Sequence, residues 1–214
     1  MGRVRTDVQA LIFDFDGLMI DSERVEADCI REVVAEWGHS LEYTDFGHLF
    51  GSVDADEEWD ELLQRTCGRT VSDLDERLHR ITRSRKDDLP LLPGVQELLD
   101  LARDRGLRVG LATGNTRPIL ERRLGRHGVF DRFDAVVTRV EVERGKPHPD
   151  IYIEVARRLE VATAACLVLE DSVLGCEAAL TAGMRVIACP SVVTAHLTFP
   201  AEAHRVASLV DVQL

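Results

Sequence analysis

The sequence predicts an α/β protein in which a parallel sheet carries a helical insert after its first strand. Short apolar runs alternate with stretches of helical periodicity from about residue 93 onward. A similar run near the N-terminus, Ala10–Phe13, is instead followed by a long segment with helical spacing and no strand pattern. Strands that alternate with helices form βαβ units, whose strands pair in parallel. We therefore expect one α/β core that is interrupted by a helical insert, or cap.

The first part of the chain contains one expected strand and then only helices. Ala10–Phe13 is apolar and ends in acidic residues, which predicts a buried strand. From about Asp21 to Asp88, apolar residues recur at the spacing of a helix face: Ile30, Val33, Val34 and Trp37, then Trp59, Leu62 and Leu63, then Leu74, Leu78 and Ile81. The same segment holds an acidic cluster, expected to be a solvated helix face, at Asp54, Asp56, Glu57, Glu58, Asp60 and Glu61.

A change of composition at residues 89–94, Leu-Pro-Leu-Leu-Pro-Gly, predicts a hinge or domain boundary, because proline and glycine end regular structure. After this point the pattern predicts helices over Val95–Arg105, Arg117–His127 and Ser172–Ala182, and one more around Ile151, Val155 and Leu159. The expected strands are Arg108–Ala112, Ala135–Thr138, Cys166–Leu169 and Arg185–Ala188, with Val206–Leu209 as a further candidate.

The composition excludes several classes of partner. The chain has 214 residues, of which 45% are hydrophobic, and a formal net charge of -12. It can therefore bury a core, while its electrostatic field repels nucleic acid and anionic lipid. The five cysteines include no Cys-x-x-Cys pair, which favours reduced thiols and a cytoplasmic location. No apolar run approaches the length of a membrane span. We expect neither nucleic acid nor membrane as a partner, and the oligomeric state stays open.

Polar side chains follow the expected strands at the point where each strand ends. They are Asp14 and Asp16, then Thr113, Gly114 and Asn115, then Lys146, and finally Glu170 and Asp171. Open parallel sheets bind ligands beyond the carboxyl ends of their strands, so we expect these residues to meet at one edge. Four carboxylates in a small volume repel one another, and a hard divalent cation relieves that repulsion. Such oxygen ligands favour Mg²⁺, which also contacts substrate phosphate.

This set of residues suits phosphoryl transfer. An aspartate at a metal site can attack phosphorus and form an aspartyl-phosphate. A second aspartate two residues later can protonate the leaving oxygen and then activate water. A lysine and a hydroxyl can neutralise and orient the phosphoryl oxygens, and the turn at Thr113-Gly114-Asn115 opens a helix whose N-terminal amides favour an anion.

Each of these elements taken singly has another interpretation. The Asp-x-Asp pair can be a capped turn, and Asn115 or Thr116 can simply cap a helix. Lys146 can be a surface loop residue, and the acidic pair Glu170-Asp171 can occupy the favourable N-terminus of the next helix. It is the order and placement of all four elements together that favours a site.

Four segments resemble the four motifs of the haloacid dehalogenase superfamily. They are ALIFDFDGLMIDSE, LATGNT, GKPHPDIY and LVLEDSVLGCEAALTAGM. They are most similar to the branch that contains β-phosphoglucomutase and small sugar-phosphate phosphatases, and the resemblance spans nearly the whole chain. It implies a Rossmann-like core formed by residues 1–20 and 90–214 and a small helical cap formed by residues 21–89. Such caps close over a substrate and exclude water.

The resemblance also implies roles for the four acidic residues. Asp14 would be the nucleophile and a magnesium ligand. Asp16 would be the general acid and base, with its backbone carbonyl also on the metal. Asp171 would be a magnesium ligand, and Glu170 either a ligand or a support for one. The dehalogenase branch lacks the second aspartate, so Asp16 disfavours dehalogenation.

The remaining site residues would hold the phosphoryl group. By the same resemblance, Thr113 would bind it with support from the turn at Gly114 and Asn115, and Lys146 would stabilise the pentavalent species. The implied ligand is a small phosphorylated metabolite, with Mg²⁺ as the cofactor.

Two departures from the family's mutases favour a phosphatase. A β-phosphoglucomutase usually carries a histidine in the first cap helix, where this chain has Glu26, and a cap arginine near the position of Asp54. We therefore expect a Mg²⁺-dependent phosphatase that acts on a sugar phosphate through an aspartyl-phosphate. The alternatives are a phosphosugar mutase, a non-catalytic phosphate-binding regulator and a receiver-type phospho-acceptor. The cap residues that set specificity stay open: Arg24, His39, His48, Arg85 and Lys86 are candidates, most of them expected at the surface.

Overall fold

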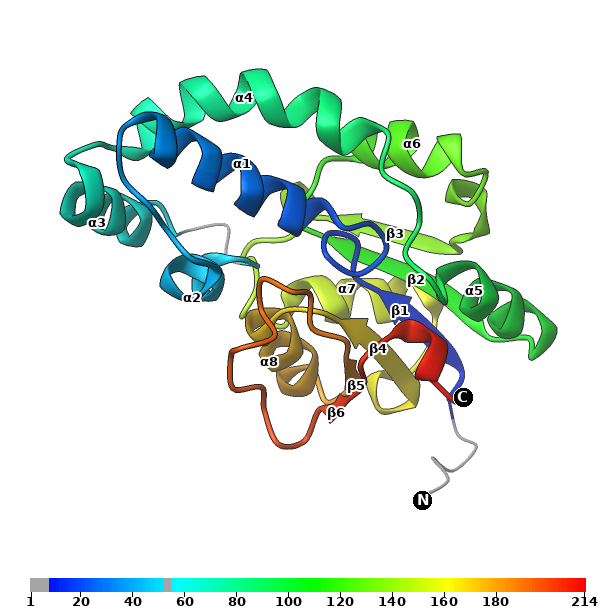
Figure 1. Ribbon diagram of the computed structural model, residues 1–214. Helices are drawn as coiled ribbons and strands as arrows, with labels where there is room; N and C mark the ends of the chain where they lie inside the picture. The colour runs from blue at the N-terminus through cyan, green and yellow to red at the C-terminus, as the bar shows by residue number, and fades with distance from the viewer. Residues whose placement is uncertain (1–7, 52–54) are drawn as a thin grey trace.

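A six-stranded parallel sheet forms the centre of the core (Figure 1). The computed structural model describes residues 8–51 and 55–214. The strands lie in the order β3-β2-β1-β4-β5-β6. Their bounds are β1 Ala10–Phe13, β2 Arg108–Thr113, β3 Ala135–Thr138, β4 Cys166–Glu170, β5 Arg185–Ala188 and β6 His204–Arg205. The expected α/β class with a parallel sheet is therefore confirmed.

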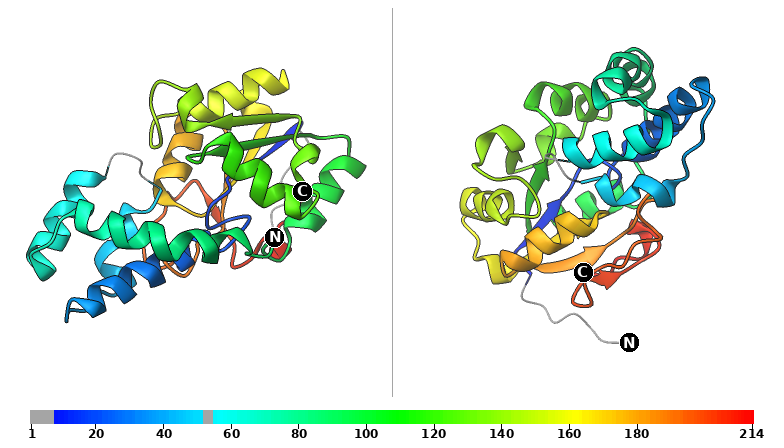
Figure 2. Two further views of the ribbon diagram at one scale, coloured as in Figure 1. Left: turned by 90° about the horizontal axis from the view of Figure 1, so that it is seen from above. Right: turned by 90° about the vertical axis from the view of Figure 1, so that its left-hand side faces the viewer.

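Helices cover both faces of this sheet, as Figures 1 and 2 show. The alternation of side chains along β1 sets the two layers: Leu11 and Phe13 enter one hydrophobic cluster, and Ala10 and Ile12 enter the other. The first cluster includes residues of α5 (Val95–Asp104) and α6 (Arg117–Arg126), and the second includes residues of α7 (Asp150–Leu159) and α8 (Val173–Thr181).

The last expected strand, Val206–Leu209, is wrong. Strand β6 is formed by His204 and Arg205, which pair with β5, and Leu209–Asp211 is a 3₁₀ turn, η5. The side chain of Ser208 accepts a hydrogen bond from the Val210 amide and thereby starts this turn. The apolar run was misleading because its residues pack against the first core cluster from a loop and a turn, not from a strand.

The insert after β1 is helical throughout its described length. Its helices are α1 Ser22–Glu36, α2 Tyr43–Phe46, α3 Asp56–Cys67 and α4 Val71–Asp87, with a 3₁₀ turn, η1, at Gly47–Leu49. They share a third hydrophobic cluster, in which α1 lies along α4 (Figure 1). Of the acidic cluster, Asp56, Glu57, Glu58 and Glu61 are exposed as expected, Asp60 is half-buried, and Asp54 lies outside the described residues.

The insert joins the core through two adjacent segments. Ile20 and Leu91 form an antiparallel bridge, and the Leu92 amide donates to the Met19 carbonyl at 2.8 Å. A further contact comes from the loop after β5, because Val193 of that loop is buried in the cap's hydrophobic cluster. The two connections therefore run side by side, and a third part of the core touches the cap.

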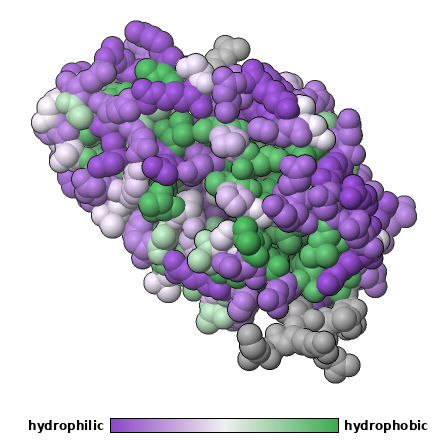
Figure 3. All heavy atoms as spheres, turned by 45° about the vertical axis from the view of Figure 1, so that its right-hand side comes forward, coloured by the Kyte–Doolittle hydropathy of each residue, from purple (hydrophilic) through white to green (hydrophobic). Residues whose placement is uncertain are grey.

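Hydrophilic side chains cover much of the face drawn in Figure 3, with smaller hydrophobic areas between them. The five cysteines, all of them within the described residues, are free. In the described part of the chain, no helix combines the length and the apolar character that crossing a membrane requires.

Candidate active site

The carboxyl ends of the central strands bring the predicted residues together. The strand order reverses between β1 and β4, which is the point where open α/β sheets bind their ligands. Asp14 follows β1 at this point and its amide donates to the Leu169 carbonyl of β4 at 3.0 Å. Thr113 ends β2, Glu170 ends β4, and Asp171 follows Glu170. Lys146 comes from the loop that precedes α7 and reaches the same place.

Lys146 lies between two buried carboxylates. Its Nζ donates to Asp14 Oδ1 at 2.5 Å and to Glu170 Oε1 at 2.5 Å. Glu170 has no exposed surface, and its Oε1 also accepts from the Tyr152 hydroxyl at 2.8 Å. Its Oε2 accepts from the amides of Asp171 and Ser172 at 2.9 and 2.8 Å. Because protein donors already occupy both oxygens, the geometry gives Glu170 the character of a support for Lys146.

Electrostatics at this edge are unfavourable without further positive charge. Burial, which Lys146 opposes, raises the pKa of Asp14 to about 8. Burial and the neighbouring carboxylates Glu23 and Glu170 raise the pKa of Asp171 well above its ordinary value. Glu170 differs: its burial is outweighed by Lys146 together with hydrogen bonds from Ser172 and Tyr152, which hold its pKa below the ordinary value. The Lys146 ammonium group therefore compensates the negative charge of Glu170. Asp14 and Asp171 are left without enough nearby positive charge to favour their ionised forms.

At this edge the buried carboxylates of Asp171 and Glu23 lie against each other, and in the described part of the chain neither Asp171 Oδ2 nor Glu23 Oε2 accepts a hydrogen bond from an N–H or hydroxyl group. Both face the backbone of Gly17, where an added Cβ would lie 2.0 Å from Asp171 Oδ2 and 2.9 Å from Glu23 Oε2. Gly17 also has a positive φ of 76°, so no other residue fits this position without strain. The backbone at Gly17, directly after Asp16, therefore lies against the Asp171 side chain.

A hard cation fits this donor set. Asp14 and Asp171 offer carboxylate oxygens, which together with a backbone carbonyl are ligands that Mg²⁺ accepts. Within residues 8–51 and 55–214, no three His, Cys, Asp or Glu side chains form a complete cation site by themselves. The backbone carbonyl of Asp16, and water, would have to complete the coordination.

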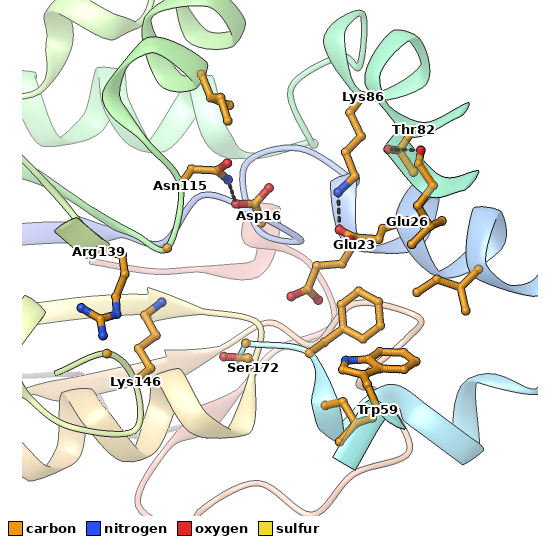
Figure 4. Close-up of a pocket in the computed structure, with 18 of the residues that line it drawn as sticks. Asp16, Glu23, Glu26, Trp59, Thr82, Lys86, Asn115, Arg139, Lys146 and Ser172 are labelled. Carbon is orange, nitrogen blue, oxygen red and sulfur yellow. Dashed lines mark hydrogen bonds and ion pairs between the residues drawn. The ribbon is translucent and has the colours of Figure 1, made fainter. Parts of the chain in front are cut away.

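Asp16 is held beside this group with its carboxylate accessible. The Ser22 hydroxyl donates to its Oδ1 at 2.6 Å, and the Asn115 side-chain amide donates to its Oδ2 (Figure 4). Its side chain is 27% exposed, whereas that of Asp14 is 9% exposed. Thr113 is buried, and its Oγ1 accepts from the Asn115 amide at 3.0 Å, which leaves the hydroxyl proton free to donate. Ser22 of the first motif and Asn115 of the second motif thus both donate hydrogen bonds to the Asp16 carboxylate.

Most of the predicted site residues, but not Thr113 or Glu170, line a cavity of about 750 Å³ between the core and the cap. Its core side includes Asp14, Asp16, Gly114, Asn115, Arg122, Arg123, Arg139, Lys146 and Asp171. Its cap side includes Glu23, Glu26, Phe50, Trp59, Asp75, Thr82 and Lys86. Lys86 donates to Glu26 across this wall (Figure 4). Of the five cap residues considered for specificity, Lys86 lines the cavity, whereas the other four are exposed and do not.

The residues of this site that were not predicted individually include Ser22, Glu23, Tyr152 and Arg123. Ser22 and Glu23 lie inside the first motif and Tyr152 inside the third, so the motifs contained the signal without assigning it. Arg123 had no signal, because an arginine in a helix rich in basic residues is ordinarily a surface residue. In the structure, Arg123 is buried and lies 3.8 Å from Asp16 Oδ1.

The chain matches the sequence model of a known protein family. The family model described as haloacid dehalogenase-like hydrolase matches residues 8–183. The chain belongs to the haloacid dehalogenase-like hydrolases. The resemblance inferred from the four motifs is therefore confirmed, and the hydrolase fold accounts for the parallel sheet and the inserted cap.

Individual relatives of this hydrolase agree with the family assignment. YhcW of Bacillus subtilis is 35% identical over 97% of this chain and 94% of its own length. Hexitol phosphatase B of Escherichia coli is 34% identical over 86% of this chain and 84% of its own length. Among solved structures, CbbY of Rhodobacter sphaeroides in complex with phosphate has a TM-score of 0.75 and 25% identity, covering 95% of this chain and 96% of that one.

Proposed function

We propose that the protein is a Mg²⁺-dependent phosphatase that hydrolyses a small sugar or polyol phosphate through an aspartyl-phosphate. The observation that carries the proposal is the position of Asp14 and Asp16 at the switch point of the sheet, with Thr113, Lys146 and Asp171 around them. The names of relatives, such as hexitol phosphatase B, support the phosphatase activity and the substrate class.

The proposed reaction has two steps. In the first, a carboxylate oxygen of Asp14 bonds to phosphorus, the ester P–O bond breaks, and Asp16 gives its proton to the departing alcohol. In the second, Asp16 takes a proton from water, which attacks phosphorus and releases inorganic phosphate and Asp14. Lys146 and the Thr113 hydroxyl bind the phosphoryl oxygens during both steps.

Asp14, Asp171 and the Asp16 carbonyl would hold the magnesium ion. When bound, the ion supplies positive charge that neutralises the nucleophile's neighbours and the phosphoryl oxygens. The buried Asp171 Oδ2 and the raised pKa values at this edge support the assignment.

The size and the polar lining of the cavity favour a polyhydroxylated phosphate ester as the substrate over inorganic phosphate. At about 750 Å³ it extends well past Asp16 to the cap, where Glu26, Lys86 and Thr82 offer polar groups. Glu26 stands where the family's mutases usually carry a histidine, and it pairs with Lys86. An acid in an ion pair is a poor substitute for a histidine that favours transfer to a sugar, so the pairing supports hydrolysis.

The deciding experiment measures phosphate release from a panel of sugar, polyol and other metabolite phosphates. We expect release that requires Mg²⁺ and stops with EDTA, and we expect Asp14→Asn to lower kcat by more than about 1,000-fold, because the nucleophile is lost. Asp104→Asn is the matched control, since Asp104 is exposed on α5.

The other outcomes identify the alternatives. Tight phosphate binding without release would indicate a regulatory binding protein. One phosphate retained per chain on Asp14 without turnover would indicate a phospho-acceptor. Interconversion of glucose 1-phosphate and glucose 6-phosphate without release would indicate a mutase.

A further inference from the structure

Helix α6 of the core is hydrogen-bonded to the segment through which the chain returns from the cap to the core. The Arg122 Nη2 donates to Asp87 Oδ1 at 2.8 Å, and the Arg126 Nη1 donates to the Asp87 carbonyl at 2.9 Å. Two residues later along the hinge, His127 Nε2 lies 2.9 Å from the Leu89 carbonyl oxygen. Asp87 is the last residue of α4, so this contact fixes the end of the cap's longest helix against the core.

The Arg123 side chain lies between Asp87 of the hinge and Asp16. Its Nε lies 3.5 Å from Asp87 Oδ1, and its Nη1 lies 3.8 Å from Asp16 Oδ1. The side chain is only 9% exposed, and within the described residues its Nε makes no hydrogen bond. Among the ion pairs of the described residues, Arg123 is the one cation that joins a hinge carboxylate to a carboxylate of the reaction centre. Arg122, one position earlier, pairs with Asp87 and not with Asp16.

The other contacts of Asp16 are neutral. Its Oδ1 accepts from the hydroxyl of Ser22, the first residue of the cap's first helix, and its Oδ2 accepts from the Asn115 amide. Neutral donors orient a carboxylate but add little net attraction, whereas a guanidinium in a partly buried setting attracts it strongly. Arg123 therefore supplies the charge that holds Asp16 toward α6, and Asp87 holds Arg123.

We propose that Arg123 is a positioning residue for Asp16, linking the orientation of the proton-transferring carboxylate to the cap hinge through Asp87. The inference rests on the proposed phosphatase function, in which Asp16 serves the departing oxygen. An error of about 1 Å in the placement of such a group is enough to lower a rate by about 100-fold.

The chemistry gives this role a signature that a purely structural role lacks. When a sugar or polyol phosphate reacts, the departing alkoxide needs the proton of Asp16 as the P–O bond breaks. When p-nitrophenyl phosphate reacts, the nitrophenolate is stable enough to leave without it. A displaced Asp16 therefore slows formation of the aspartyl-phosphate from alkyl esters and spares the nitrophenyl ester.

The experiment compares kcat/KM for the best alkyl phosphate of the panel and for p-nitrophenyl phosphate in Arg123→Gln and Arg126→Gln, with Mg²⁺ present. We expect Arg123→Gln to lower kcat/KM for the alkyl ester by roughly 10- to 100-fold and for the nitrophenyl ester by less than about threefold. Arg126→Gln is the matched control, because Arg126 contacts the hinge at the Asp87 carbonyl but does not line the cavity; we expect it to change both values by less than about threefold. Arg123→Lys should restore part of the alkyl-ester rate, since it keeps the charge.

Equal losses on both esters in Arg123→Gln, or the same pattern in Arg126→Gln, would overturn the proposal and leave the phosphatase function intact. Absence of phosphate release by the unmodified protein would instead reject the phosphatase function itself. If Arg123→Gln does not fold, Asp87→Asn decides: it frees Arg123 from the hinge, and we expect an alkyl-ester loss of about three- to tenfold with the nitrophenyl rate retained. An unchanged ratio of the two rates in Asp87→Asn would then refute the link.

Discussion

Two lysines line the cavity, and the core and the cap surround them differently. Lys146 is 10% exposed, and its partner Glu170 is completely buried and held by Tyr152 and Ser172. Lys86 is 14% exposed, but its partner Glu26 is 40% exposed and therefore open to water. A buried network holds one arrangement, whereas a half-open pair can exchange partners with a substrate. The difference separates a fixed reaction centre on the core from an adaptable wall on the cap.

The strongest way to break this comparison is to remove the charge of the core lysine. Lys146→Met should lower kcat by roughly 100- to 1,000-fold, because it removes the cation beside Asp14, the proposed nucleophile. Steady-state phosphate release measures the effect, and Lys86→Met is the matched control, with kcat expected within about threefold of the unmodified protein. Comparable losses of kcat in the two variants would remove the distinction between core and cap.

The cap lysine should act on binding. Lys86→Met and Glu26→Gln each break the pair on the cap wall. We expect KM for a polyol phosphate to rise by about three- to tenfold while kcat stays nearly constant, because these groups contact the substrate equally before and during the reaction. KM for p-nitrophenyl phosphate should stay unchanged, since that ester offers no hydroxyl groups. A fall in kcat without a change in KM would place the pair in the reaction centre instead.

The smallest effect is expected for a charge cluster outside the cavity, on α7. Hydrogen bonds from Arg157 and then Arg158 lower the pKa of Glu154 from 4.5 to about 2. A lowered carboxyl pKa stabilises the fold above the ordinary pKa, and this contribution disappears as the pH falls through about 2. Glu154→Gln should therefore reduce the free energy of unfolding at pH 6 by less than about 1 kcal/mol. Urea titrations of both proteins should show the difference closing toward pH 2, and a difference that persists there would contradict the assignment.

The sequence allowed the strands of the core to be predicted because their ends are sharply marked. Ala10–Phe13 and Ala135–Thr138 are short apolar runs between polar residues, and both strands have the expected bounds. The failure at the C-terminus has the opposite cause. Strand β6 consists of the exposed polar residues His204 and Arg205, which no apolar pattern marks, while the apolar residues after them pack from irregular structure.

The site was predictable to the extent that strand ends define it. Asp14, Thr113 and Glu170 follow or end central strands, so a parallel sheet brings them together. Arg123 could not be found in this way, because helical spacing gives the face of a residue but not the partner across from it. Only the packing of α6 against the hinge places its guanidinium beside Asp16.

Val193 connects the position of the cap to the hydration of an apolar side chain, in addition to the geometry of the hinge. This core residue has no exposed surface and is buried among the cap's apolar side chains. Any motion that lifts the cap from this loop must hydrate it, and burial of a valine side chain contributes about 1.5–3 kcal/mol. That energy corresponds to a roughly 10- to 100-fold preference for the docked arrangement. This side chain, distant in sequence from both connections, thus adds a hydrophobic contribution to the energy that holds the cap over the cavity.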